Sequence, residues 1–227
     1  MQESKLNKEA QLCLQQLLLI WFEFERRLNK VPIIKRLEIG YFTLEDYQSL
    51  LLHLRQQVIE GSRWITRSAS SFNRDYSDVR SIVIGHAKDE HRDYEILETD
   101  YVKSGGTLEE IQSATRNIGT EALHGFLMHR ASESNPIDLV GAMWIIEGLG
   151  QKMATDWADR IDQLLGGDNN CVNFLRYHGE NDAKHMDKFY KLLDRLCTSE
   201  KCAESITRTA KVVARLYTMQ LEEIDDH

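Results

Sequence analysis

The chain has 227 residues and a formal net charge of −8. Apolar residues make up 42% and charged residues 28%, which is typical of a globular protein with a sizeable core. The acidic balance and the lack of a basic stripe argue against a nucleic-acid partner. The longest early apolar run, LLLIWF, is too short to span a bilayer, and the charged start lacks a secretory signal. We therefore expect a cytoplasmic protein with no membrane partner, whose four cysteines are free thiols.

Helix caps and breakers divide the chain into a series of predicted helices, and strand-like alternation of useful length is absent from the sequence. The first predicted helix covers residues 5–30. The second starts at the N-cap Thr43, with Asp46 three residues later, and runs to about residue 70. The third covers residues 73–104 and ends at Gly105–Gly106.

The second half of the chain continues the pattern. A fourth predicted helix covers residues 107–131 and opens with a capping box of Thr107 and Glu110. The fifth covers residues 135–165, with Asn135 as the cap and Pro136 at the first helical position. The sixth covers residues 174–196, and the seventh runs from Ser199 nearly to the end. Seven helices with short connections predict an all-α bundle that forms a single domain over residues 1–227.

The stretch HGENDAKH contains potential metal ligands at regular helical spacing. His178, Asp182 and His185 stand at positions i, i+4 and i+7, so they lie within about 60° of one another on a helix. Two imidazoles and a carboxylate suit iron, manganese or zinc. The alternative is a solvated polar face that happens to contain histidines.

Glu147 is a single carboxylate in the apolar stretch AMWIIEGLG. A helix that is apolar all round is expected at the centre of a bundle, and a carboxylate buried there needs a cation or a proton. The alternative is that Glu147 points to solvent or pairs with a basic residue. The nearby Gly141, Gly148 and Gly150 would allow a neighbouring helix to approach closely.

The third predicted helix offers further candidates opposite these residues. His86 and Glu90 fall on or near its apolar stripe, and His91 lies beside them. The alternative is exposed charge along the run HAKDEHRD. The second helix adds Glu60, which lies near the polar edge of that helix.

The blocks AMWIIEGLG and FLRYHGENDAKH, about thirty residues apart, resemble the haem-oxygenase-like di-iron oxidases and oxygenases. These proteins share a seven-helix bundle with TenA-type thiaminases and pyrroloquinoline-quinone synthase. Their signature is Glu, His, Glu and then His-x3-Asp-x2-His. The resemblance places the last block on His178, Asp182 and His185, the second Glu on Glu147 and the first His near His91.

The sequence departs from this signature where the first Glu is expected, because residues 81–84 are Ser, Ile, Val and Ile. Three arrangements of the N-terminal half remain open. A helical bulge would bring Glu90 in beside His91, His86 and Glu90 would form the pair, or Asp93 would substitute. Glu60 would correspond to an additional carboxylate found in some members, and Lys88 would place an ammonium near this half.

The resemblance implies a non-haem enzyme that binds two Fe(II) ions, the second of them weakly. It implies O2 as co-substrate, a small organic molecule as substrate, and a homodimer. The implied metal ligands are Glu60, Glu90, His91, Glu147, His178, Asp182 and His185. One alternative is a metal-free TenA-like protein that binds a small molecule or acts without a cofactor. Another is a ferritin-like di-metal bundle, suggested by the Glu-x2-His motif of Glu121 and His124.

Overall fold

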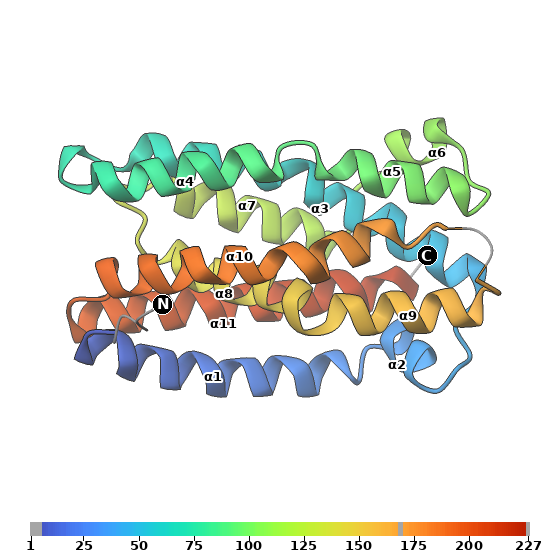
Figure 1. Ribbon diagram of the computed structural model, residues 1–227, viewed down its shortest axis with the longest axis horizontal. Coiled ribbons are helices and arrows are strands. Elements are labelled where there is room, and N and C mark those ends of the chain that lie inside the picture. Colours follow the sequence, from blue (N-terminus) through green and yellow to red (C-terminus); the bar gives the residue numbers. More distant parts are fainter. Residues whose placement is uncertain (1–5, 168–169, 226–227) are drawn as a thin grey trace.

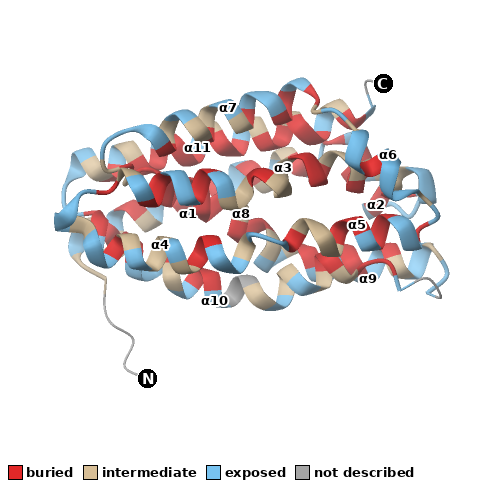
Figure 2. Ribbon diagram, turned by 90° about the horizontal axis from the view of Figure 1, so that it is seen from above, coloured by how far each residue is buried: buried red, intermediate tan, exposed pale blue. Residues whose placement is uncertain are grey.

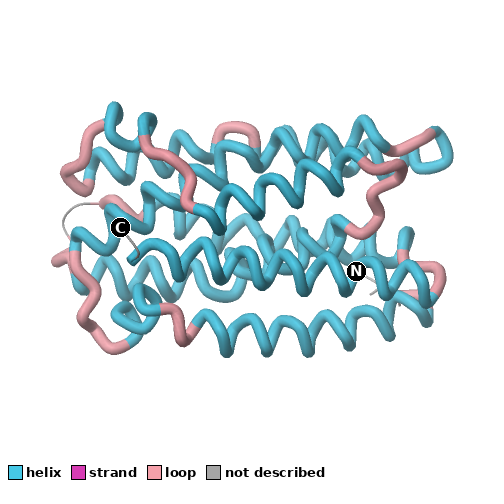
Figure 3. Tube along the Cα trace, turned by 180° about the vertical axis from the view of Figure 1, so that it is seen from behind, coloured by secondary structure: helices cyan, strands magenta, loops and turns pink. Residues whose placement is uncertain are grey.

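The computed structural model describes residues 6–167 and 170–225, with the side chains of residues 182 and 183 left out. Over these residues the chain forms helices and turns with no strand, which confirms the predicted all-α class (Figure 3). Most turns lie at the two ends of a bundle of long helices. The turn between residues 90 and 93 is different, because it interrupts a row of helices near its middle.

The N-terminal half supplies two opposite edges of the bundle (Figure 1). Helices α1 (Lys8–Leu28) and α2 (Pro32–Glu38) follow each other along one edge. Helices α4 (Ser77–Glu90) and α5 (Asp93–Lys103) follow each other along the other, and α3 (Leu44–Ser71) packs against both of them.

The C-terminal half fills the space between these edges. The remaining α-helices are α6 (Leu108–Ser113), α7 (Ile118–Ser132), α8 (Leu139–Leu149), α9 (Thr155–Leu164), α10 (Asn173–Leu196) and α11 (Glu200–Glu222). A π-helical segment (Gly150–Ala154) joins α8 to α9, so the two follow each other through the bundle (Figure 1). Helix α11 packs against α1, α7 and α8.

The predicted count of seven helices is not confirmed, because α1 to α11 make eleven α-helices within the described parts of the chain. Three of the predicted helices are divided. The third is split into α4 and α5, the fourth into α6 and α7, and the fifth into α8, the π-helical segment and α9. Helix α2 was not predicted, although Pro32 occupies its first position.

Local capping signals fixed several helix starts correctly. Capping boxes at Thr43 and Thr107 open α3 and α6, and Ser199 caps α11. The predicted start of the fifth helix at Asn135 is wrong, because Asn135 has a φ of 51° and α8 begins at Leu139. The carboxylate of Asp138 instead accepts hydrogen bonds from Arg130 and Thr209, and these tertiary contacts fix the start of α8.

Helix α8 occupies the centre of the bundle, where every residue from Leu139 to Leu149 except Ile146 is buried (Figure 2). Gly141 permits its close contact with α11, because a Cβ there would lie 2.1 Å from the carbonyl oxygen of Ile206. This confirms the expected role of a glycine in close helix approach at that position. Glu147 therefore sits on a central helix among apolar neighbours.

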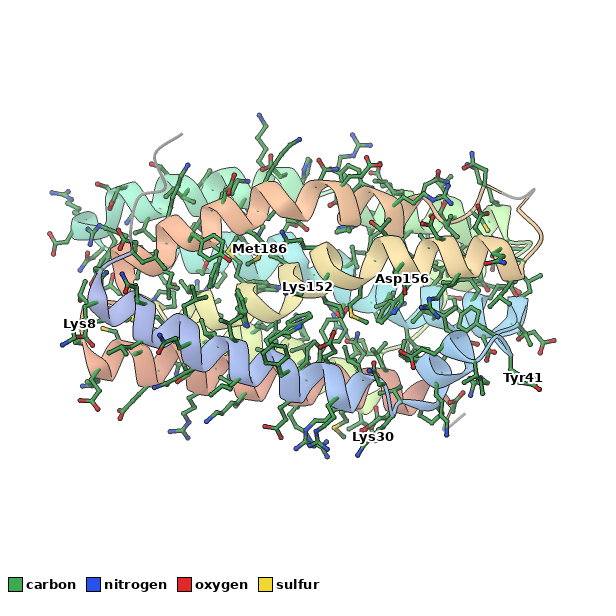
Figure 4. All side chains as sticks on the ribbon, turned by 60° about the horizontal axis from the view of Figure 1, so that its bottom comes forward. Lys8, Lys30, Tyr41, Lys152, Asp156 and Met186 are labelled. Carbon is green, nitrogen blue, oxygen red and sulfur yellow. The ribbon has the colours of Figure 1, made fainter. Side chains whose placement is uncertain are left out.

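The π-helical segment passes beside α10, and Figure 4 labels Lys152 in the segment and Met186 on α10. The approach is close at Gly179, where a Cβ would lie 2.0 Å from Oγ1 of Thr155. A π-helical turn widens the helix by an extra residue, and such turns often occur at functional sites. Here the turn begins three residues after Glu147 and lies opposite the part of α10 that carries His178.

None of the helices in the described part of the chain is long and apolar enough to cross a membrane.

Candidate metal centre

Two rows of side chains with the same spacing face each other across the bundle. His86, Glu90 and Asp93 stand at i, i+4 and i+7 along α4 and the start of α5, and His178 and His185 stand seven residues apart on α10. The helices run in opposite directions at this point, because His86 lies against His185 and Asp93 lies against His178. Glu147 reaches this layer from α8.

The first group consists of His86, Glu90, Glu147 and His185. Nε2 of His86 lies 3.1 Å from Oε1 of Glu147, and Nδ1 of His185 donates a hydrogen bond to Oε2 of the same carboxylate at 2.9 Å. Nδ1 of His185 is also 3.3 Å from Oε1 of Glu90. One potential ligand atom from each of the four residues lies within 4.8 Å of the others.

The second group consists of Glu90, Asp93 and His178, so Glu90 belongs to both groups. Nε2 of His178 lies 3.4 Å from Oδ2 of Asp93. The other ring nitrogen, Nδ1, lies 2.9 Å from the carbonyl oxygen of Phe174. Because a carbonyl only accepts, Nδ1 of His178 carries the proton, and in the neutral ring the lone pair of Nε2 points towards the group.

Asp182, which was predicted as a ligand, has a side chain outside the described residues. Its place on α10, four residues after His178 and three before His185, is as the sequence predicted.

The chemistry of this donor set fits a pair of divalent transition-metal ions. Three buried ligand atoms lie 3.1–3.4 Å from a polar neighbour without forming a well-aligned hydrogen bond, namely Nε2 of His86, Oε1 of Glu90 and Oδ2 of Asp93. A buried polar atom without a partner is costly, and a bound cation removes that cost. Imidazole and carboxylate together suit iron or manganese, and Glu90 would be a ligand common to both positions.

In the metal-free protein, His86 and His185 partly supply the positive charge that a bound cation would otherwise provide to Glu147. Burial alone would raise the pKa of Glu147, but the charge of His86 and the hydrogen bond from His185 outweigh burial and hold that pKa below its ordinary value. Burial raises the pKa of Glu90 to about 7, and the charge of Glu147 acts in the same direction. A cation bound between the two groups would favour the ionised form of Glu90.

A largely apolar pocket opens onto both groups. Glu90, Glu147 and His178 line this pocket, which we call the α3 pocket because six residues of α3 line it. Its other walls come from α8, the π-helical segment, α9, α10 and α11, with Trp64 and Trp157 among the lining residues. A molecule in the α3 pocket would therefore touch ligands of both metal positions.

The structure places two of the predicted ligands outside both groups. His91 is exposed, ends α4, and has its ring 2.9 Å from the carbonyl oxygen of Lys88. Glu60 is buried elsewhere and pairs with Arg116 at 2.7 Å and Arg63 at 2.9 Å, which neutralise its charge. Lys88 is exposed, so its ammonium does not enter the cluster.

Three arrangements were open for the N-terminal half of the site. The structure combines the pair of His86 and Glu90 with the substitution by Asp93, and it does not bring Glu90 in beside His91. His86, Glu90 and Asp93 join the cluster and His91 does not. The signal that could have found them is the spacing, since His86, Glu90 and Asp93 repeat the i, i+4, i+7 pattern of His178, Asp182 and His185.

The all-α bundle has a haem-oxygenase-like fold, and its buried histidines and carboxylates form two groups that could hold metal ions. Residues 84–218 match the family of iron-containing redox enzymes. This match spans more than half of the 227 residues and includes both groups, and the chain belongs to that family.

Solved structures share the fold at low sequence identity. A domain of unknown function with a haem-oxygenase-like fold from Shewanella denitrificans OS217 superimposes with a TM-score of 0.80 and 16% identity, covering 90% of this chain and 88% of that chain. A TenA homologue from Pseudomonas syringae pv. tomato superimposes with a TM-score of 0.77 and 11% identity, covering 100% of this chain and 96% of that chain. A TenA homologue from P. horikoshii OT3 superimposes with a TM-score of 0.74 and 14% identity, covering 93% of this chain and 97% of that chain. The search of curated proteins found no match.

Proposed function

We propose that this chain is a non-haem di-iron enzyme that uses O2 to oxidise a small organic substrate. The observation that carries the proposal is the pair of buried ligand groups that share Glu90, in which three ligand atoms form no well-aligned hydrogen bond. Membership of an iron-containing redox family favours iron over other metals for this donor set.

In the proposed enzyme, His86, Glu90, Glu147 and His185 hold one ferrous ion, and Glu90, Asp93 and His178 hold the other. Two ferrous ions supply the electrons that reduce O2. Asp182 remains a proposed additional ligand on the strength of its position on α10.

The protein's own residues fix the ligands and exclude water. The carbonyl of Phe174 orients the imidazole of His178, and such outer contacts typically change metal affinity by about 10- to 100-fold. Glu147 is 6% exposed, so its carboxylate interacts in a medium of low dielectric constant. The α3 pocket brings substrate to the side of the cluster where Glu90, Glu147 and His178 are all accessible from one space.

An anaerobic ferrous titration tests the proposal. We expect about two equivalents bound to the wild-type protein, and less than one to Glu90→Ala, because Glu90 serves both positions. His129→Ala is the matched control, since the His129 side chain is 68% exposed and lies outside both groups, and it should bind as wild type does. Exposure to O2 should then oxidise the iron of the wild-type protein and of the control. Binding of no iron by wild type would contradict the proposal.

The second candidate is a metal-free TenA-like protein that binds a small molecule in the same pocket. The fold shared with two TenA homologues and the presence of the apolar α3 pocket favour it. In that case ligand binding would be unaffected by iron, and Glu90→Ala would bind no less metal than wild type.

A further inference from the structure

The lining of the α3 pocket restricts the chemistry of its ligand. Eighteen residues line it, and besides Glu90, Glu147 and His178 none of them is Lys, Arg, Asp, Glu or His. The polar side chains among the rest are the amide of Gln57, the hydroxyl of Tyr217 and two indoles. The walls are otherwise aliphatic or aromatic, for example Leu54, Val58 and Leu175.

Among the described lining residues, none away from the cluster carries a charge that could pair with an ionised group of the ligand. Burying an unpaired ammonium, guanidinium or phosphate is costly, so the body of the ligand must be uncharged. The Oε1 of Gln57 already accepts a hydrogen bond from Nε2 of Gln220 at 2.7 Å. The empty space in and around the pocket is about 880 Å³, a volume that includes the part open to solvent.

A second apolar pocket lies on the other side of Trp64 and Ile65, but it is a poorer substrate site. Of the residues in the two ligand groups it contacts His86 alone. The α3 pocket contacts residues of both groups, and a reaction that uses two metal ions requires access to both.

Gly61 forms part of the α3 pocket wall in a way that sets the available space. It lies in the interior of α3, and a Cβ at this position would meet no heavy atom within 4 Å. A glycine inside a helix costs about 1 kcal/mol relative to alanine. A side chain at position 61 would extend into open space, and Gly61 lines the α3 pocket. We therefore assign this open space to the pocket.

We propose that the substrate of this enzyme is a molecule with an uncharged, apolar body that lies in the α3 pocket, and that Gly61 determines how large that body can be. This inference rests on the proposed function for the role of the cluster. Binding itself depends only on the pocket.

Calorimetric titration with straight-chain primary alcohols from hexanol to decanol tests the inference. Burial of each methylene contributes about 0.8 kcal/mol, so affinity should rise about fourfold per methylene until the pocket is full. A decane diamine with an ammonium at each end should bind at least about tenfold more weakly than decanol, because one ammonium must lie among apolar walls.

Gly61→Phe should weaken decanol binding at least about tenfold by filling the pocket. Gly125→Phe is the matched control, because Gly125 is also a helical glycine with no heavy atom within 4 Å of an added Cβ, and it does not line the α3 pocket. The control should bind decanol as wild type does.

Three outcomes would overturn the inference: no binding of any alcohol by wild type, equal binding of the diamine and decanol, or the same loss in both glycine variants. Iron stoichiometry should be unchanged in Gly61→Phe. A failure of the pocket inference would therefore leave iron binding intact, whereas a failure of the proposed function would appear as absent iron with alcohol binding retained.

Discussion

At the scale of single residues, Glu90 is the side chain that the two ligand groups share. It belongs to both ligand groups, and its buried Oε1 lies 3.3 Å from Nδ1 of His185 without forming a well-aligned hydrogen bond. Without a metal, burial and the nearby charge of Glu147 disfavour the ionised carboxylate of Glu90. With a metal, the ionised carboxylate is the form that binds the cation. Its protonation therefore affects the metal-free and metal-loaded proteins in opposite directions.

The first prediction concerns the stability of the metal-free protein. A carboxyl whose folded-state pKa is raised favours folding when protonated, so stability is lost as the pH rises from 4.5, the ordinary value, through about 7. Glu90→Gln removes this dependence. Relative to the variant, wild type should lose up to about 3 kcal/mol over this interval, at about 1.36 kcal/mol per pH unit.

Urea unfolding of both proteins at pH 5 and pH 8, in the presence of chelator, measures the difference. Glu90→Gln should be the more stable protein at pH 8, and the difference should largely vanish at pH 5. If the free energy of unfolding changes equally with pH in both proteins, ionisation of Glu90 does not destabilise the folded state.

The second prediction concerns the unequal strength of the two metal positions. The group with four described residues includes Glu147, on which His86 and His185 converge, whereas the other has three. His178→Ala should therefore retain about one ferrous equivalent. His185→Ala should retain much less than one at the same iron concentration, because it removes a ligand of the stronger position.

Iron retention after gel filtration gives the comparison directly, with His91→Ala as the control for loss of a histidine outside the cluster. If His178→Ala and His185→Ala lose iron equally, the two positions assemble as one unit.

At the scale of helices, the sequence was sufficient for the elements whose ends depend on local chemistry. The caps at Thr43, Thr107 and Ser199 bind backbone amides within their own segments, so a local pattern identifies them. The start of α8 could not be found in this way, because Asp138 is held by Arg130 and by Thr209 of α11. A tertiary contact of this kind leaves no local signal.

The candidate site shows the same division. Glu147 and His178 were found because a carboxylate in an apolar run and a regular His spacing are visible locally. The choice between His86 and His91 depends on which face of α4 meets α10, since His86 packs on His185 with ring centres 4.8 Å apart. The turn at residues 91–92 contains neither glycine nor proline, so no local signal predicts that the helix is interrupted there.

The third prediction tests the packing that places Glu147 in the cluster. In Gly141→Ala the new Cβ would lie 2.1 Å from the carbonyl oxygen of Ile206, so α8 and α11 must separate. We expect destabilisation of about 1–3 kcal/mol, as for other overpacked core positions. Gly125→Ala, where the added Cβ meets open space, should instead stabilise by about 0.5–1 kcal/mol. Chemical denaturation of both variants measures the change in the free energy of unfolding, which should have opposite signs. Destabilisation of both variants would point to a general intolerance of larger side chains.

At the scale of the whole molecule, the two ligand groups connect parts of the chain that are far apart in sequence. The ligands come from α4, the start of α5, α8 and α10; α4 and α5 lie along one edge of the bundle in Figure 1, and α8 and α10 lie between the edges. A metal bound to them acts as a cross-link that exists only in the folded state. Ligands that bind the native state alone stabilise it by mass action.

The last prediction follows from this linkage. With ferrous iron supplied anaerobically at about 100 times its dissociation constant, one site adds about 2.7 kcal/mol to the free energy of unfolding. For a protein of this size each kcal/mol raises Tm by about 2–4 °C, so Tm should rise by about 5–10 °C and fall again when chelator is added. Glu147→Gln keeps the size of the side chain but removes the charge on which His86 and His185 converge, and it should abolish most of the shift. Differential scanning calorimetry of both proteins, with and without iron, measures it. An equal shift in Glu147→Gln would place the stabilising iron at some site other than this cluster.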